Sequence, residues 1–217
     1  MNVVSVEVEL GEGKVKLKEG MVLCTPTEGP CEVVAIEKKK ILGKDVNFCK
    51  LVSKIDGLNV FLPLEKMRGM GVRTVISAEN AKKILTNIFD KHAKTMKGVW
   101  TKKVQEYEKK LYSGNIVLVA EIVRDLFANM KDPSRSYGER AIYNNALNKM
   151  VEEFALALGV SKQEAHKTIT DKLEEKYVAT HKNIVSKMED DFMDGDSDEN
   201  NDFEDDDSDF DDSENVA

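Results

Sequence analysis

Residues 91–126 read KHAKTMKGVWTKKVQEYEKKLYSGNIVLVAEIVRDL and hold the only tryptophan of the chain, Trp100. Lysines and one histidine lie on both sides of this indole in the sequence, and they are Lys91, His92, Lys94, Lys97, Lys102, Lys103, Lys109 and Lys110. A large aromatic ring among cations suits a protein that lies along phosphates while the ring touches bases. The alternative interpretation is that Trp100 anchors a small helical core and that the lysines form a solvated face.

On both sides of this stretch, apolar residues recur with the spacing of amphipathic helices. Side chains that favour helix starts precede four of these patterns, and the predicted N-caps are Ser77, Asn115, Ser136 and Ser161. The last two belong to capping boxes with a glutamate three residues later, and Gly159 is predicted to end the helix between them. The C-terminal part of the chain therefore predicts a compact bundle of four or five short helices.

Short runs rich in β-branched residues dominate the part before this bundle, from Leu17 to Pro63. Pro and Gly residues separate the runs, and Asp56-Gly57 indicates a two-residue hairpin turn. Four or five short strands in so few residues predict a small, strongly curved sheet or barrel. The residues before Leu17 alternate only weakly, which is compatible with a short strand or with a loose arm.

Charge is distributed unevenly along the 217 residues, although the net charge is only −8. Residues 189–217 carry 16 of the 40 acidic side chains and no Lys or Arg, so the preceding 188 residues carry a net charge of +8. A basic body favours a polyanionic partner, and an acidic tail can modulate its field. We expect the tail to be disordered, because it has too few apolar residues to offset the entropy of ordering. It is either a solubility tail or a mimic of nucleic acid that competes for the basic face.

Several functional classes find little support in the sequence. The three cysteines, Cys24, Cys31 and Cys49, form no Cys-x-x-Cys pair and lie far from any histidine, so we expect neither a metal site nor a cofactor. The glycine-rich residues 69–73 lack the spacing of a phosphate-binding loop. We find no catalytic constellation, membrane span or signal peptide, and so expect a cytoplasmic protein with reduced thiols that is not an enzyme.

The order of the motifs resembles that of the CarD–CdnL family of bacterial transcription regulators. Spaced motifs carry the resemblance over about residues 17–176, and they are Gly71-Val-Arg73 with Val75-Ile-Ser77, Trp100-Thr-Lys-Lys103, Ser113-Gly114 with Val119-Ala-Glu-Ile-Val-Arg-Asp-Leu126, and Gly138-Glu-Arg140. The N-terminal module of that family is shared with the polymerase-interacting domain of transcription-repair coupling factor.

The resemblance implies an α+β protein with five parts. They are an N-terminal arm (1–16), a Tudor-like module that interacts with RNA polymerase (17–68), a joint (69–78), a helical module that contacts DNA (79–180) and the acidic tail (188–217). The residues implied to bind polymerase are Lys39, Phe61, Leu62 and Pro63. Those implied to bind DNA are Trp100, Lys102, Lys103, Lys110, Tyr137 and Arg140.

From this resemblance we expect a monomer that binds the β subunit of RNA polymerase and stabilises the promoter open complex. Contact with DNA is expected at the upstream fork of the transcription bubble, without sequence specificity, and association with the nucleoid is expected through the polymerase. The alternative is a free-standing DNA-binding regulator that does not bind RNA polymerase.

Overall fold

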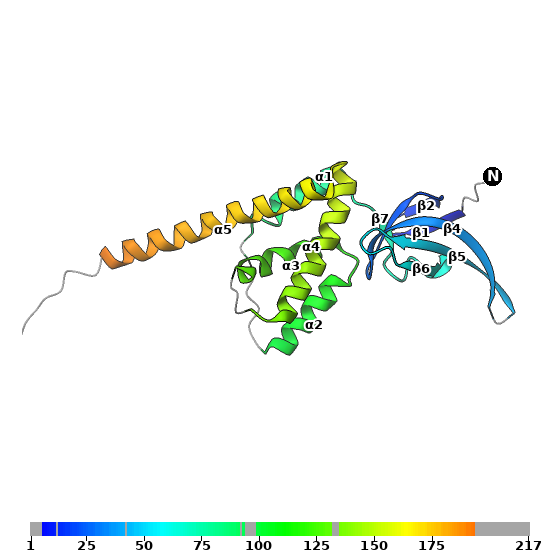
Figure 1. The fold of residues 1–217 in the computed structure, drawn as a ribbon, viewed down its shortest axis with the longest axis horizontal. Helices are drawn as coiled ribbons and strands as arrows, with labels where there is room; N and C mark the ends of the chain where they lie inside the picture. The colour runs from blue at the N-terminus through cyan, green and yellow to red at the C-terminus, as the bar shows by residue number, and fades with distance from the viewer. Residues whose placement is uncertain are drawn as a thin grey trace, which may run out of the picture. The chain divides into compact units, whose positions relative to one another are not determined.

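The computed structural model describes residues 6–11, 13–41, 43–91, 93, 99–131 and 135–193, and it describes side chains for these residues except Trp100 and 181–193. Strands come first along the chain and α-helices follow after residue 74, as Figure 1 shows. This order confirms the predicted α+β class. The described residues up to Ala179 belong to one compact unit.

The β module consists of a hairpin and a five-stranded sheet, both antiparallel. The hairpin pairs β1 (Val6–Leu10) with β2 (Gly13–Leu17). The larger sheet has the strand order β6-β5-β4-β3-β7, and its strands are β3 (Val22–Thr25), β4 (Gly29–Ile41), β5 (Lys44–Ser53), β6 (Asn59–Pro63) and β7 (Arg73–Thr74). A short 3-10 helix, η1 (Leu64–Lys66), follows β6.

The hairpin answers the question that the sequence left open for the first residues. Leu10 and Leu17 are buried in the core of the β module, with Leu17 completely inaccessible to solvent. The described part of the predicted arm is therefore a structural component of this module.

Alternation along the strands explains which side chains form the β core. On β5, Cys49, Leu51 and Ser53 are buried, whereas Lys50 and Val52 between them are half-buried on the outer face of the sheet. Successive strand residues point to opposite faces, so one face of the sheet packs against the core and the other meets solvent.

The connection between β5 and β6 differs from the predicted two-residue turn at Asp56-Gly57. Five residues, 54–58, join the two strands. The Gly57 amide donates to the Ser53 carbonyl over 3.0 Å, and the Leu58 amide donates to Asp56 Oδ1 over 3.2 Å. These bonds stabilise a wider loop, in which Gly57 supplies the positive φ of 75°.

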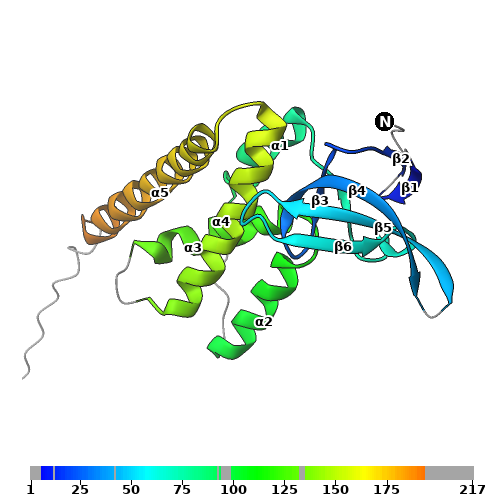
Figure 2. The same ribbon diagram turned by 45° about the vertical axis from the view of Figure 1, so that its right-hand side comes forward.

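Five α-helices form the rest of the described chain, and Figure 2 shows them from a second direction. They are α1 (Ala78–Asn87), α2 (Trp100–Leu111), α3 (Ile116–Met130), α4 (Tyr137–Leu158) and α5 (Lys162–Met193). All four predicted N-caps are confirmed, because Ser77, Asn115, Ser136 and Ser161 each accept a hydrogen bond from a first-turn amide. Gly159 ends α4 with the left-handed φ of 68°, as predicted.

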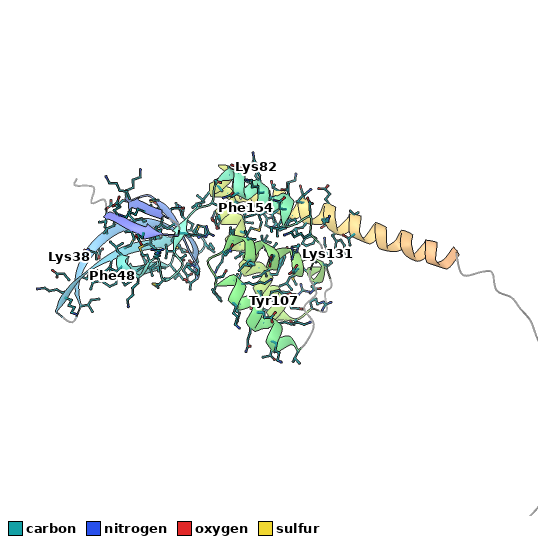
Figure 3. The ribbon with its side chains drawn as sticks, turned by 180° about the vertical axis from the view of Figure 1, so that it is seen from behind. Lys38, Phe48, Lys82, Tyr107, Lys131 and Phe154 are labelled. Carbon is teal, nitrogen blue, oxygen red and sulfur yellow. The ribbon has the colours of Figure 1, made fainter. Side chains whose placement is uncertain are left out.

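The helical module packs its α1–α4 faces and the first turns of α5 into one apolar core. Tyr107 of α2 and Phe154 of α4, both labelled in Figure 3, are buried in it. Ala165, Ile169 and Leu173 add the face of α5 that the sequence predicts to be buried. Spacings of three and four residues place these apolar side chains on one side of each helix.

Helix α5 continues to Met193, past residue 188 at which the disordered tail is predicted to begin. Residues 194–217 lie outside the described part of the chain, so the disorder of that segment stays a prediction. None of the described helices is long and apolar enough to cross a membrane.

Candidate functional site

An aromatic ring framed by two lysines lies on the outer face of the β module. Phe61 of β6 is 45% exposed, the Lys39 ammonium lies 4.4 Å from its ring centroid, and Lys50 lies 5.9 Å from it. The register of β5 and β6 pairs Lys50 with Phe61. A cation near an aromatic face is attracted by the ring quadrupole. The structure thus brings together Lys39 and Phe61, two residues of the predicted polymerase site.

The other two residues of that predicted site differ from each other in exposure. Pro63 is half buried and pairs with Phe48 of β5. Leu62, by contrast, is only 7% exposed and belongs to the β core. Strand alternation turns Leu62 away from the face that carries Phe61. We therefore infer that Leu62 supports the strand, while Phe61 and Pro63 remain accessible.

Strand β6 is also an edge of the five-stranded sheet. An edge strand carries backbone N–H and C=O groups that have no neighbour on one side and can pair with a strand from a partner. The aromatic patch and this open edge belong to the same five-residue strand. A partner protein can therefore use backbone pairing and side-chain contacts together.

The first turn of α2 has a feature that the sequence did not reveal. Its N-cap residue is Val99, which is 70% exposed and supplies no side-chain hydrogen bond to the turn. The other described α-helices all receive such a bond. Uncapped amides and the positive end of the helix dipole favour an anion such as phosphate at this end.

The predicted DNA-binding residues of α2 differ in their surroundings. Trp100 is the first residue of the helix, but its side chain lies outside the described residues. Lys102 is exposed and Lys103 is half buried in the same first turn. Lys110 lies near the other end of the helix, and its Nζ is 2.8 Å from Oε2 of Glu121 on α3. Because that carboxylate already balances its charge, Lys110 is a weaker candidate for phosphate contact.

Tyr137 and Arg140 occupy the first turn of α4. Tyr137 is 87% exposed, the highest exposure of any large hydrophobic side chain given for the described residues. Arg140 is half buried, and its Nε donates to the Arg135 carbonyl over 3.4 Å. Figures 1 and 2 draw the beginnings of α2 and α4 at the same end of the helical module. Two helix N-termini and several cations therefore belong to one end of this module.

A buried ion pair connects the β module to the helical module. The Arg73 guanidinium of β7 forms a bidentate pair with the Glu153 carboxylate of α4, in which Nη2 lies 2.9 Å from Oε2. Arg73 Nε also donates to the Gly114 carbonyl over 2.6 Å, and the Ile76 amide donates to Glu153 over 3.2 Å. Planar, bidentate pairs of this kind are among the stronger hydrogen-bonded contacts in proteins.

Close backbone packing accompanies this ion pair. A Cβ added to Gly114 would lie 2.9 Å from the Gly71 carbonyl oxygen and 3.2 Å from Pro26. On the α4 side, Lys149 donates to the Pro26 carbonyl over 2.7 Å and lies 4.7 Å from the centroid of the Tyr112 ring. Arg73 and Gly114 both belong to motifs of the family resemblance. Glu153, which the sequence analysis did not single out, shows no local pattern that marks it.

The buried cysteines are poor candidates for metal or nucleophilic chemistry. Burial raises the pKa of Cys31 and of Cys49 to about 11 each and raises that of Cys24 further, so all three thiols stay protonated at neutral pH. In the described part of the chain, no group of three or more His, Cys, Asp or Glu residues is arranged to hold a metal ion.

A known domain family and a known protein are similar to this chain. Residues 83–170 match the model of the CarD C-terminal domain. The Bacillus subtilis (strain 168) protein named "Putative transcription factor YdeB" is 24% identical over 139 residues, which cover 64% of this chain and 90% of that protein. Both matches support the class of transcription regulators for this chain. These two matches support assignment of the chain to the CarD–CdnL family.

Proposed function

We propose that this protein binds the β subunit of RNA polymerase through its β module and stabilises the promoter open complex through its helical module. The first turn of α2 carries the second half of this proposal. It combines an uncapped helix N-terminus with Lys102, Lys103 and the backbone position of Trp100. Phosphate contacts from such groups position a protein on DNA without reading its sequence.

The Trp100 indole then serves as a wedge at the upstream fork of the bubble, where the duplex has already begun to part. Stacking of one aromatic side chain on a base contributes about 1–3 kcal/mol. About 1.4 kcal/mol corresponds to a tenfold change in an equilibrium constant. A single stacked indole can therefore shift the balance between closed and open complexes about tenfold. The protein does not have to melt DNA, because stronger binding to the open state is sufficient.

The polymerase-binding half of the proposal rests on the patch of Phe61, Lys39 and Pro63 and on the open edge of β6. A partner strand paired with this edge gains backbone hydrogen bonds, and its side chains meet the exposed ring and the ammonium group. Aromatic residues at such positions often contribute most to binding. Binding through one module keeps the other module close to promoter DNA, which raises its effective concentration there.

Open-complex lifetime is the direct test of the wedge. We expect Trp100→Ala to bind polymerase as the wild type does, while open complexes dissociate as quickly as without the protein. Thr101→Ala changes the neighbouring exposed residue and serves as the control for disturbance of the helix. Unchanged lifetimes with Trp100→Ala would reject the wedge.

The lysines of α2 allow a graded test of DNA contact. Lys102→Ala should lower affinity for DNA and reduce its dependence on salt, because fewer counterions are released. Lys110→Ala should change both less, because Glu121 already compensates that charge. Equal effects of the two substitutions would contradict the assignment of the first turn of α2 to DNA.

Polymerase binding separates the proposal from its main alternative. Phe61→Ala should weaken capture of the isolated polymerase β subunit, whereas Leu58→Ala, which removes a 55% exposed side chain three residues earlier, should not. If the protein is a free-standing DNA-binding regulator, the wild type and both variants should bind promoter DNA with equal affinity. None of the three should bind the β subunit. That result would replace the proposal with this alternative.

A further inference from the structure

A groove of about 310 Å³ lies in the β module, and its lining does not include Phe61. One wall is strand β1, from Val6 to Glu9, and the opposite wall includes Asn47 of β5, Leu64 and Glu65 of η1, and Arg68. None of these residues belongs to the proposed polymerase or DNA surfaces.

The edge of β1 faces this groove. Four successive residues line it, although Val6 and Val8 turn toward the core and Glu7 and Glu9 toward solvent. Side chains on opposite faces of a strand can line the same groove only where the edge of that strand faces it. In the described part of the chain β1 pairs on its other side with β2 alone. An antiparallel strand with one partner leaves every second N–H and C=O group directed to its free edge.

The existing partner of β1 shows which sequence this strand accepts. Its register places Lys16 opposite Glu7 and Lys14 opposite Glu9. Val15 lies opposite Val8 between these charged pairs. Cross-strand pairs of opposite charge and pairs of β-branched residues both stabilise a sheet. The free edge presents the same alternation of valine and glutamate as the paired edge does.

The opposite wall of the groove extends this pattern. Leu64 is only 5% exposed and adds apolar surface beside the valines, whereas Glu65 is exposed and adds a third carboxylate. Arg68 is the one cation of the lining, and it is already ion-paired with Glu9. The groove therefore combines an apolar floor, an acidic rim and unpaired backbone groups.

We propose that this groove is a docking site for an extended segment of a partner protein in which apolar and cationic residues alternate. The segment adds to the free edge of β1 as a third strand. Its apolar side chains pack beside Val6, Val8 and Leu64, and its Lys or Arg side chains meet Glu7 and Glu65. Backbone pairing gives affinity in this recognition mode, and the alternating side chains give specificity.

Two other occupants fit the groove poorly. Nucleic acid is disfavoured, because phosphates would approach the carboxylates of Glu7 and Glu65, and Arg68 of the lining is already paired with Glu9. A second copy of β1 in antiparallel pairing places glutamates opposite glutamates, and like charges in that position destabilise a sheet. A peptide in which lysine and apolar residues alternate matches both the acidic side chains of the groove and the alternation of side chains along β1.

The test uses the full chain, labelled with 15N, and a blocked synthetic peptide of sequence Gly-Lys-Val-Lys-Val-Lys-Gly. We expect amide shifts to change at residues 6–9, at Asn47 and at residues 64–65. Glu65→Lys should weaken binding of the peptide about tenfold, which corresponds to about 1.4 kcal/mol. Glu19→Lys makes the same charge change at an exposed residue outside the groove and should leave binding unchanged.

Two altered peptides complete the experiment. Replacement of the lysines by glutamates should abolish binding. Replacement of the central lysine and the valine after it by prolines should also abolish binding, because it removes backbone donors. The proposal is overturned if the basic peptide does not bind, if it shifts amides elsewhere, or if Glu65→Lys and Glu19→Lys bind it equally. Shifts of the groove residues by a duplex DNA oligonucleotide would also overturn it.

Discussion

Replacement of Glu153 by alanine tests how the two modules are joined. The Glu153 side chain is 3% exposed, and it accepts hydrogen bonds from Arg73 and from the Ile76 amide. Removal of one partner of a buried ion pair costs about 3–5 kcal/mol, because an uncompensated charge remains. Arg73 is 23% exposed and keeps its bond to the Gly114 carbonyl, so we expect the lower end, about 3 kcal/mol.

Thermal and urea unfolding followed by circular dichroism measure this effect. For a unit of this size, about 3 kcal/mol corresponds to a fall in Tm of about 6–12 °C. Glu174→Ala is the control, because it removes a carboxylate from a half-exposed pair with Lys131, for which about 0.2–1 kcal/mol is expected. If Glu153→Ala and Glu174→Ala lowered stability equally, Arg73 and Glu153 would not form a buried connection and the reasoning would fail.

Three further predictions concern the junction and the tail. Gly114→Ala should destabilise the chain by about 2–4 kcal/mol, because left-handed backbone strain adds to the crowding of the new Cβ against the Gly71 carbonyl. Gly159→Ala is the control: open space surrounds this position, so only the backbone strain of about 1–2 kcal/mol is expected. Equal losses of stability in the two variants would exclude the close approach at Gly114. Partial burial lowers the pKa of Lys149 to about 8 from its ordinary 10.5, although the nearby Glu28 acts to raise it. Below pH 8 the charged lysine therefore lowers the stability of the folded state. This destabilisation decreases as the pH rises from 8 to 10.5. Thermal unfolding across this range should therefore show the wild type gaining stability relative to Lys149→Met, and a constant difference would contradict the assignment. Deletion of residues 189–217 should strengthen binding to DNA at low salt, and equal affinity of the full-length and truncated chains would count against a competing tail.

Signals that act over a few residues could be predicted from the sequence. Ser136 and Ser161 mark helix starts because a hydroxyl bonds an amide three residues away, and Gly159 marks a helix end because it tolerates a positive φ. Each depends only on its immediate neighbours, and each is confirmed. The prediction of a two-residue turn at Asp56-Gly57 was wrong, because hydrogen bonds to Ser53, which lies outside the dipeptide, stabilise a longer loop.

Contacts between distant parts of the sequence could not be predicted in this way. Arg73 and Glu153 are separated by 80 positions, and no periodicity along α4 distinguishes this glutamate from Glu152 beside it. Arg73 was expected in a joint, whereas it belongs to β7 and pairs with Cys24 of β3. Among the candidate site residues, Phe61 was expected from the resemblance, but its contact with Lys39 depends on the register of three strands.

The missing cap on α2 illustrates a compromise between durability and activity. A serine in place of Val99 would strengthen the helix by about 1 kcal/mol. It would also occupy amides that the proposed function offers to DNA. Selection for a more robust fold and selection for tighter promoter contact therefore act in opposite directions at this one position. Variants of this regulator chosen only for heat resistance would be expected to lose activity first at the start of α2.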